Sequence, residues 1–178
     1  MVRAAAARVL GEQALPLVND PVKLVRRAAA WPLIDRLVHM PQYAAAVREQ
    51  EQIALCRAEQ PNGAMQLAVL ALARGNRTEA EQQYRRAIKL DPAGPVAYVD
   101  FAVFLAQESR LSEALDCMLK AASAAPQDAD VQYRLGLLLA EMGQYEFAYT
   151  AFERAVRLNP QHAPAQRNFE TLKQYLKK

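Results

Sequence analysis

The sequence is poor in the residues that build metal and disulfide sites. Its 178 residues include two cysteines and two histidines. Cys56 and Cys117 lack the paired spacing of a zinc site or a disulfide framework, so we interpret both as buried free thiols. His39 and His162 have no histidine or cysteine three or four positions away, the spacing at which two ligands share a helix face. We therefore expect no metal site, and we interpret both histidines as surface or helix-capping residues.

Patterns associated with catalysis are missing as well. The sequence contains neither a glycine-rich phosphate loop nor a nucleophile elbow. Carboxylate pairs such as Glu49/Glu51 and Glu79/Glu81 are two positions apart, so their side chains point to different faces of a helix. Because no acid, base or nucleophile groups converge, we expect the chain not to be an enzyme and to bind no cofactor.

Runs of β-branched and aromatic residues, which strands need, are also absent, and aromatics make up 7% of the chain. Alanine supplies an unusual share of the 52% hydrophobic residues. It is the best helix former, and it lets neighbouring helices approach closely. No apolar stretch reaches the ~18–20 residues of a membrane span. Arg3 and Arg8 interrupt the first residues, which therefore do not resemble a signal peptide. The composition predicts an all-α protein.

The charges show no strong excess of one sign, with 22 basic and 19 acidic residues interspersed along the chain. The densest basic clusters are Lys23/Arg26/Arg27 and Lys177–Lys178. No aromatic residues accompany them in the pattern of a nucleic-acid-binding motif. We interpret them as solvated helix faces and expect no nucleic-acid partner.

A period of roughly 34 residues organises the second half of the sequence. Pro92, Pro126 and Pro160 lie one such period apart, and each follows a stretch with helical character. Proline cannot continue a helix, so each of the three marks a helix end. In this register the inter-helix turns coincide at Gly75-Asn76, Ser109-Arg110 and Gly143-Gln144, which are residue types that favour helix ends and tight turns.

In the same register small side chains align with small ones, and large side chains align with large ones. The aligned sets are Ala80, Ala114 and Ala148; Ala87, Ala121 and Ala155; Tyr84, Met118 and Phe152; and Leu67, Phe101 and Leu135, the last set followed by Ala68, Ala102 and Gly136. Small residues let the two helices of a pair pack at short distance, and the large residue fills the space before the next pair. A single pair cannot bury its apolar face, so stacked neighbours complete the core.

These residues resemble the tetratricopeptide repeat family, whose signature is W-x2-L-G-x2-Y, then A-x3-F, then P. The third repeat is the most similar, with Leu135-Gly136, Ala148, Phe152 and Pro160 in place. The first lacks the leading aromatic, and the second has Tyr98 in that position but Met118 in place of the later Phe. The resemblance implies an α-solenoid, a right-handed superhelix of helix hairpins. It covers three repeats over 62–162 with breaks near 94/95 and 128/129, followed by a C-terminal capping helix over 163–178.

A shorter self-similarity precedes these repeats. Val2-Arg3-Ala4-Ala5-Ala6-Ala7 and Val25-Arg26-Arg27-Ala28-Ala29-Ala30 match at a spacing of 23. Asp20-Pro21 has the pattern of an N-cap followed by proline at the first helical position. The pattern Asp-Pro-x-x-x-Val-Arg-x-Ala-Ala-Ala over residues 20–30 resembles a HEAT-type repeat. We therefore expect HEAT-like helices over 1–40 and a connecting helix over 41–61. Because no polar cap precedes the array, we expect it to be truncated and Met1 to be an internal start.

The order of HEAT-like helices, a joining helix and three tetratricopeptide repeats resembles the C-terminal region of some bacterial multihaem cytochrome c-type proteins. This chain has no Cys-x-x-Cys-His, so any haem-binding part would lie upstream. The resemblance offers an alternative function, in which the repeats are a docking appendage of a larger bacterial redox protein. It also leaves the compartment open: cytoplasmic by default, periplasmic for such a tail.

In the repeat family the first helix of each pair lines a concave surface. The resemblance assigns this partner-binding groove to Met65, Gln66, Val69, Val99, Asp100, Val103, Tyr133, Arg134 and Leu137. The set lacks the Lys/Asn/Lys/Arg clamp with which chaperone-binding repeats hold a C-terminal carboxylate, so we do not expect a receptor for Hsp70 or Hsp90 tails.

The first helices are also apolar on nearly every side. In the first repeat Met65, Leu67, Val69, Leu70 and Leu72 cover all faces, and a helix of this kind is normally buried. Three interpretations follow. The groove holds an apolar or amphipathic partner segment, or it is covered by the protein itself or by a second copy, or these residues pack only between neighbouring repeats. We expect a scaffold that binds a protein or peptide partner, with self-association as a further option.

Overall fold

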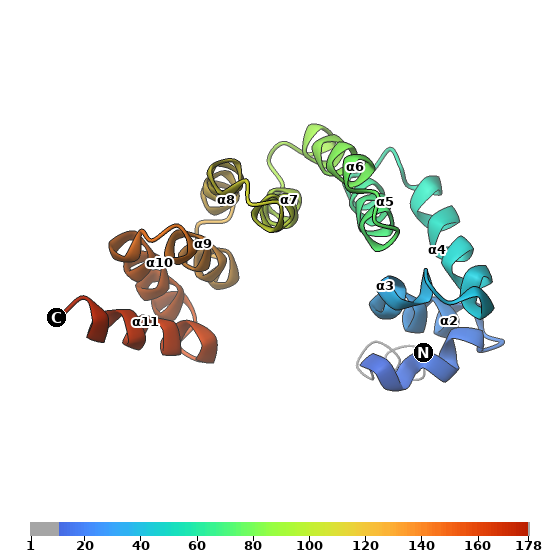
Figure 1. The fold of residues 1–178 in the computed structure, drawn as a ribbon, viewed down its shortest axis with the longest axis horizontal. Coiled ribbons are helices and arrows are strands. Elements are labelled where there is room, and N and C mark those ends of the chain that lie inside the picture. The colour runs from blue at the N-terminus through green and yellow to red at the C-terminus, as the bar shows by residue number, and fades with distance from the viewer. Residues whose placement is uncertain (1–10, 178) are drawn as a thin grey trace. The chain divides into compact units, whose positions relative to one another are not determined.

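The computed structural model describes residues 11–177, and over this range the chain is helical without a strand (Figure 1). This confirms the all-α prediction. The first copy of the HEAT-like phrase, Val2–Ala7, lies outside the described residues. The elements, in chain order, are η1 (Gly11–Asn19), α2 (Lys23–Ala30), η2 (Trp31–Leu33), α3 (Ile34–Leu37), η3 (Pro41–Tyr43), α4 (Ala44–Cys56), α5 (Pro61–Ala73), α6 (Arg77–Leu90), α7 (Pro95–Gln107), α8 (Leu111–Ala124), α9 (Ala129–Glu141), α10 (Tyr145–Leu158) and α11 (Ala163–Tyr175).

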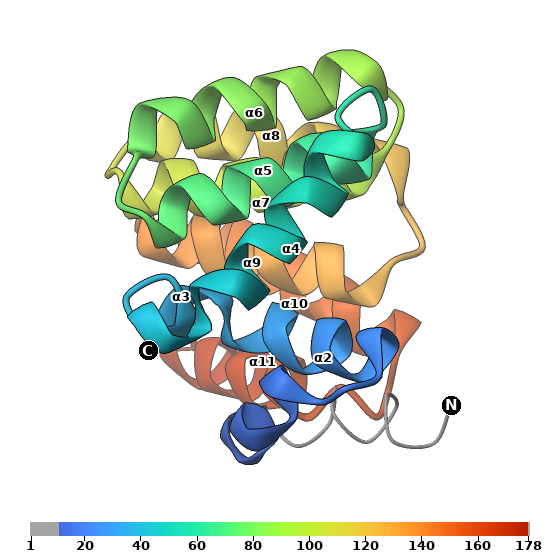
Figure 2. The ribbon, with the colours of Figure 1, turned by 90° about the vertical axis from the view of Figure 1, so that its right-hand side faces the viewer.

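Three helix hairpins follow one another from Pro61 onwards: α5 with α6, α7 with α8, and α9 with α10 (Figures 1 and 2). Each turns at a residue in the left-handed region, with φ of 77° at Gly75, 61° at Ser109 and 73° at Gly143. The residue after each turn donates its backbone N–H to a carbonyl five positions earlier; Asn76 does so to Ala71 at 2.8 Å. This bond satisfies a carbonyl that the end of the helix leaves unpaired. The three predicted turns are confirmed.

The aligned small and large residues form the interior of the hairpins. The alanines of both aligned sets have no exposed surface, and Tyr84, Met118 and Phe152 are exposed by 4%, 2% and 1%. Alanine at the crossing points lets the helices come close, and the large side chain fills the space that remains. Full burial of one such side chain stabilises the fold by about 1.5–3 kcal/mol. The packing role predicted for these positions is confirmed.

The chain falls into two compact units, residues 1–90 and 91–178. In the first unit α2, α3, α4 and the short 3₁₀ segments enclose an apolar cluster in which Leu37 is fully buried, and Leu70 of α5 belongs to the same cluster. Arg74, at the end of α5, donates two hydrogen bonds of 2.7 and 2.8 Å to Glu51 of α4. These hydrogen bonds lower the pKa of Glu51. Glu49 instead bonds Arg26 at 3.4 Å, so the two carboxylates do point in different directions.

The structure corrects the predicted start of the second HEAT-like helix. Helix α2 begins at Lys23, after Val22 in an extended conformation, and Asp20 is not its N-cap. Asp20 is buried, and its Oδ1 accepts a 2.8 Å hydrogen bond from the Val22 N–H. A short polar side chain that bonds the backbone two residues on stabilises a turn rather than a helix start. The turn between η1 and α2 therefore delays the helix by two residues.

The cysteines also differ from the prediction of buried thiols. Cys56 is exposed and Cys117 is partly exposed. Cys56 is the last residue of α4, in a stretch where the neighbouring Leu55 and Arg57 are exposed as well. It continues the exposed face of the helix, which also carries Arg48, Gln52 and Leu55 at helical spacing, whereas Ala54 lies on the buried face. The domain boundaries inferred from the repeat register stay a prediction.

Candidate partner-binding groove

Helix α7 provides one wall of the groove because its sequence is apolar on all sides. Its buried side chains, among them Tyr98, Phe101 and Leu105, pack into the second unit. Two apolar side chains of α7 remain exposed, Val96 by 57% at the start of the helix and Val103 by 37% further along it. On α9, Leu137 is 41% exposed, while Leu135 and Leu138 are buried. Val103 and Leu137, from two consecutive repeats, therefore remain open to solvent.

These side chains border a hollow of about 260 Å³ within the second unit. The walls come from α7 and α9, and Met118 of α8 contributes to the lining. The lining residues are Ala102, Val103, Ala106, Gln107, Met118, Arg134, Leu137, Leu138 and Glu141. We call this hollow the α7–α9 groove. Its surface is mainly apolar, with polar groups confined to a few side chains, which is the usual character of a site that binds an apolar side chain.

Charge in this region is concentrated on a few residues. Asp100 of α7 is partly buried, and this burial raises the pKa of its carboxyl group, while the positive charge of Arg134 on α9 acts in the opposite direction. Burial disfavours the charged form because a carboxylate loses hydration that nothing replaces fully. Glu141 adds a second carboxylate to the lining. The surface thus combines an apolar floor with two acidic groups and one basic group.

The structure brings together three of the nine predicted residues in this groove: Val103, Arg134 and Leu137. Asp100 lies close enough for Arg134 to affect its pKa. Val99 is 8% exposed and belongs to the interior of the unit. The groove also contains residues outside the predicted set. Gln107 and Glu141 occupy equivalent positions in consecutive repeats, at the ends of α7 and α9, so the repeat register contained a signal for them.

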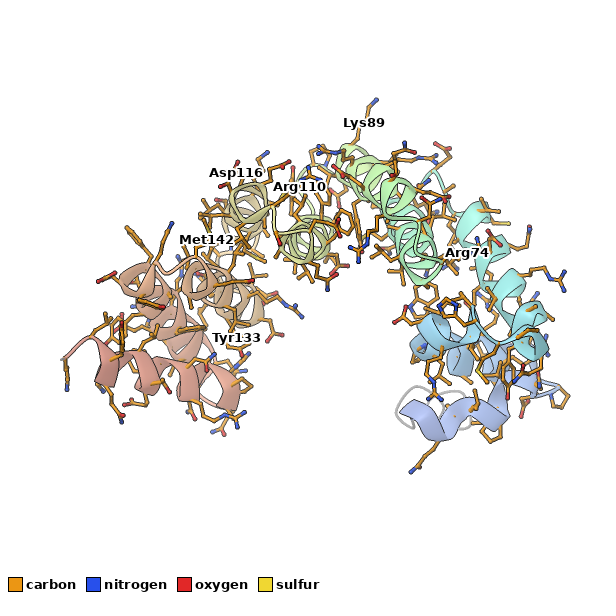
Figure 3. The ribbon with its side chains drawn as sticks, viewed as in Figure 1. Arg74, Lys89, Arg110, Asp116, Tyr133 and Met142 are labelled. Atoms are coloured by element: carbon orange, nitrogen blue, oxygen red, sulfur yellow. The ribbon has the colours of Figure 1, made fainter. Side chains whose placement is uncertain are left out.

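Tyr133 serves the packing of the third hairpin. Its ring lies 5.7 Å from that of Phe152 and 4.7 Å from that of His162, measured between ring centroids, and it projects from α9 (Figure 3). His162 is the N-cap of α11: its Nδ1 accepts a 3.0 Å hydrogen bond from the Ala165 N–H, and its Nε2 lies 2.9 Å from Asp130 Oδ1. The capping role predicted for this histidine is confirmed, and Tyr133 supports it.

Met65, Gln66 and Val69 belong to α5 in the first unit. Val69 packs against the N-terminal apolar cluster. Gln66 borders a separate hollow whose other walls include Trp31 and Ile53 from the preceding helices. In this unit the chain's own helices cover part of the surface that the family resemblance assigns to a partner.

Within residues 11–177 no three His, Cys, Asp or Glu side chains are grouped so that they could hold a metal ion. None of the helices in the same range has the length and apolarity needed to cross a membrane.

Comparison with known proteins identifies the repeats. Two tetratricopeptide repeat profiles match residues 71–138 and 129–162, which together span just over half of the chain. The human protein O-mannosyl-transferase TMTC3 is 33% identical over 85 residues, equal to 47% of this chain and 9% of TMTC3. The chain thus spans about a tenth of the length of this relative.

Solved structures show the same fold at low identity. The first tetratricopeptide domain of Spaghetti (RPAP3), bound to the HSP90 peptide SRMEEVD, has a TM-score of 0.61 and 18% identity, with 68% of this chain and 96% of that chain covered. MamA has a TM-score of 0.61 and 19% identity, with coverage of 72% and 75%. The Sgt2 domain from Aspergillus fumigatus has a TM-score of 0.59 and 22% identity, with coverage of 66% and 79%. With the hairpins, the turns and the profile matches in agreement, the chain belongs to the tetratricopeptide repeat family.

Proposed function

We propose that the chain is a scaffold for protein–protein interaction that binds an apolar or amphipathic partner segment in the α7–α9 groove. The observation that carries the proposal is the pair of exposed apolar side chains, Val103 and Leu137, on the two walls of one hollow. Exposed apolar surface in a concave site is stabilised when a partner removes it from water. The hollow of about 260 Å³ has room for a large apolar side chain.

The charges favour this type of segment over an acidic tail. Arg134 is the basic residue in the lining, and it shares the groove with Glu141. A carboxylate-rich segment would be repelled by Glu141 and Asp100 and would find one guanidinium to pair with. The relative RPAP3 holds an HSP90 peptide that ends in Glu-Glu-Val-Asp. We do not extend that ligand to this chain, because its groove lacks a comparable set of cations.

The partner segment is proposed to place an apolar side chain between Val103 and Leu137 and to turn its polar side towards Asp100 and Arg134. An amphipathic helix satisfies both conditions, since its apolar stripe enters the groove while polar side chains at the edge of that stripe reach Asp100 and Arg134. Part of the α5 surface is covered by the N-terminal helices, so the proposed contact is confined to the second unit. The transferase activity named for the human relative belongs to a protein of which this chain spans 9%, and we propose no catalysis.

The test is affinity purification with the chain as bait, followed by mass spectrometry and by binding measurements on the purified partner. The double variant Val103→Glu/Leu137→Glu places two charges on the groove walls at positions exposed enough to leave the fold intact. It should lose the partner. Leu90→Glu/Leu176→Glu is the matched control, because each leucine is 37% exposed and neither lines the α7–α9 groove. A folded double variant that keeps the same partner at the same affinity would refute the proposal.

A further inference from the structure

A second apolar cleft lies on the other side of α9. Its volume is about 370 Å³, and α8, α9 and α10 form its walls. On α9 it is lined by Gln132, Leu135 and Leu139, whereas the α7–α9 groove uses Arg134 and Leu137. The full lining is Leu115, Leu119, Gln132, Leu135, Leu139, Gln144, Phe147, Thr150, Ala151 and Arg154. We call this hollow the α8–α10 cleft, and it plays no part in the function proposed above.

Among the residues that line the cleft is a glutamine, at a position where the second repeat has an aromatic side chain. Gln132 stands one repeat after Tyr98, which fills the equivalent place in the second repeat and is 8% exposed. Gln132 is itself buried, with 3% exposed, and its amide nitrogen has no hydrogen-bond partner among the described residues. A buried amide without a partner is unfavourable, and a narrow glutamine side chain fills less volume than a ring. The third repeat therefore has a glutamine in the lining of this cleft, where the second repeat has the larger ring of Tyr98.

The rim of the same cleft carries a large exposed side chain. Phe147, at the start of α10, is 66% exposed, and Leu119 of α8 is 47% exposed. Both line the cleft. Aromatic side chains remove about 150–250 Å² from water when they are buried, so leaving a phenyl ring exposed forgoes a large stabilisation. One face of the second unit thus presents both the exposed ring of Phe147 and the α8–α10 cleft beside it.

We propose that this face binds the same face of a second copy, with Phe147 of each copy entering the α8–α10 cleft of the other. A two-fold interface requires one patch that is complementary to itself, and a projection beside a hollow meets that requirement. The size is sufficient, because an apolar cavity of about 150 Å³ accommodates benzene. In each copy the entering ring lies against Leu115, Leu135 and Leu139.

The charges beside the cleft are compatible with this pairing. Helix α8 carries Asp116 and Lys120 next to the lining positions, and Asp116 points outward from α8 (Figure 3). Helix α10 carries Glu146 beside the lining residue Phe147, and Arg154 in the lining itself. Because these four charges are of both signs and sum to zero, two copies of the face do not repel one another. A strongly acidic or basic face would have favoured a different protein as the partner.

The experiment is sedimentation velocity on the full chain at concentrations up to about 1 mM, a range that includes weak dimers. The wild-type chain should form a concentration-dependent dimer. Phe147→Glu removes the ring, and Gln132→Tyr fills the cleft as Tyr98 does in the second repeat. Each variant should weaken dimerisation at least tenfold while circular dichroism shows an unchanged helix content. Val103→Glu, in the α7–α9 groove, should dimerise like the wild type.

A mixture provides a sharper test. Phe147→Ala leaves the cleft open but removes the ring, and Gln132→Tyr keeps the ring but closes the cleft. Each variant alone should be monomeric, and the two mixed should associate more weakly than the wild type, because one of the two insertions is restored. A wild-type chain that stays monomeric over the whole range overturns the proposal. So does a dimer that both variants retain, or one that is lost in folded Val103→Glu instead.

Discussion

Gly136 provides the most specific test of how the third hairpin is packed. It lies on α9 where α10 crosses, and a Cβ atom added to it would lie 2.6 Å from both Cδ1 and Cε1 of Phe152 and 3.1 Å from its Cζ. Real Cβ atoms do not approach carbon this closely. The ring has little freedom to move, because Phe152 is 1% exposed and lies against Tyr133. Gly136→Ala therefore forces α9 and α10 apart or twists the ring from its rotamer.

Two opposing effects determine how much Gly136→Ala changes the free energy of unfolding. Overpacking a well-filled core costs about 1–3 kcal/mol. Alanine in the interior of a helix is more stable than glycine by about 1 kcal/mol. The clash outweighs the gain in helix propensity, so we expect Gly136→Ala to lower the free energy of unfolding by about 1 kcal/mol, and by up to about 2 kcal/mol if the ring cannot yield.

The repeats themselves contain the compensating change. At the same two positions the second repeat has Ala102 and Met118, and methionine adapts its shape more readily than a ring. In Gly136→Ala/Phe152→Met the added methyl group therefore meets a flexible side chain. The double variant should lose at least about 1 kcal/mol less than the sum of the two single variants. The first repeat has Ala68 with Tyr84, so a ring beside alanine is tolerated where the helices are spaced for it.

The assay is urea unfolding of the wild type, the two single variants and the double variant, followed by circular dichroism. The four free energies form a double-mutant cycle, which isolates the interaction between the two positions. Two results would refute the reasoning. The first is a Gly136→Ala variant as stable as the wild type, and the second is a cycle in which the single effects simply add.

Three other predictions concern a turn, a carboxyl group and a helix cap. Ser109 has φ of 61°, so Ser109→Gly should stabilise the chain by up to about 1 kcal/mol in thermal unfolding. Gly143→Ala should destabilise the chain by a similar amount, because φ is 73° at Gly143 and alanine is strained in this conformation. The effect should not be larger, because the added Cβ meets no atom within 4 Å. Burial raises the pKa of Asp100, so the folded state holds its proton to higher pH than the unfolded state does, and the stability of the wild type falls as pH rises from the ordinary pKa of 3.8 through the raised one. Asp100→Asn removes this step, so its advantage over the wild type in unfolding experiments should grow across the same window; an advantage that is independent of pH would contradict the assignment. His162→Ala should expose the first turn of α11 to hydrogen exchange, with a loss of about 1–2 kcal/mol at the Ala165 amide, whereas His162→Asn, which can still cap the helix, should lose less.

The repeat register is the part of the fold that the sequence predicts best, because it depends on local chemistry. Gly75 and Gly143 adopt the left-handed conformation without a steric penalty, and the backbone bond that closes each turn involves residues five positions apart. The buried alanines and Phe152 recur at the spacing of helix faces, so their interior position follows from periodicity. Each of these inferences needs information from one hairpin only.

The candidate site could be predicted only in part. The repeat positions identify the side of α7 and α9 that carries Val103 and Leu137, but they do not show which side chains the neighbouring elements cover. Val69 stands at the same repeat position as Val103, yet it packs against the N-terminal cluster. This outcome depends on contacts between segments distant in the sequence.

By itself, the sequence determined that the chain is helical, where its hairpins turn and which side chains fill them. These properties arise from backbone preferences and from spacing within a single repeat. Tertiary structure decided which apolar surface is open. The glutamine at position 132 is visible in the sequence as a departure from the repeat, but packing of α8, α9 and α10 around it turns that departure into a cleft beside Phe147. Whether a missing side chain leaves a cavity depends on how far the surrounding helices can close on it, and no local pattern contains that information.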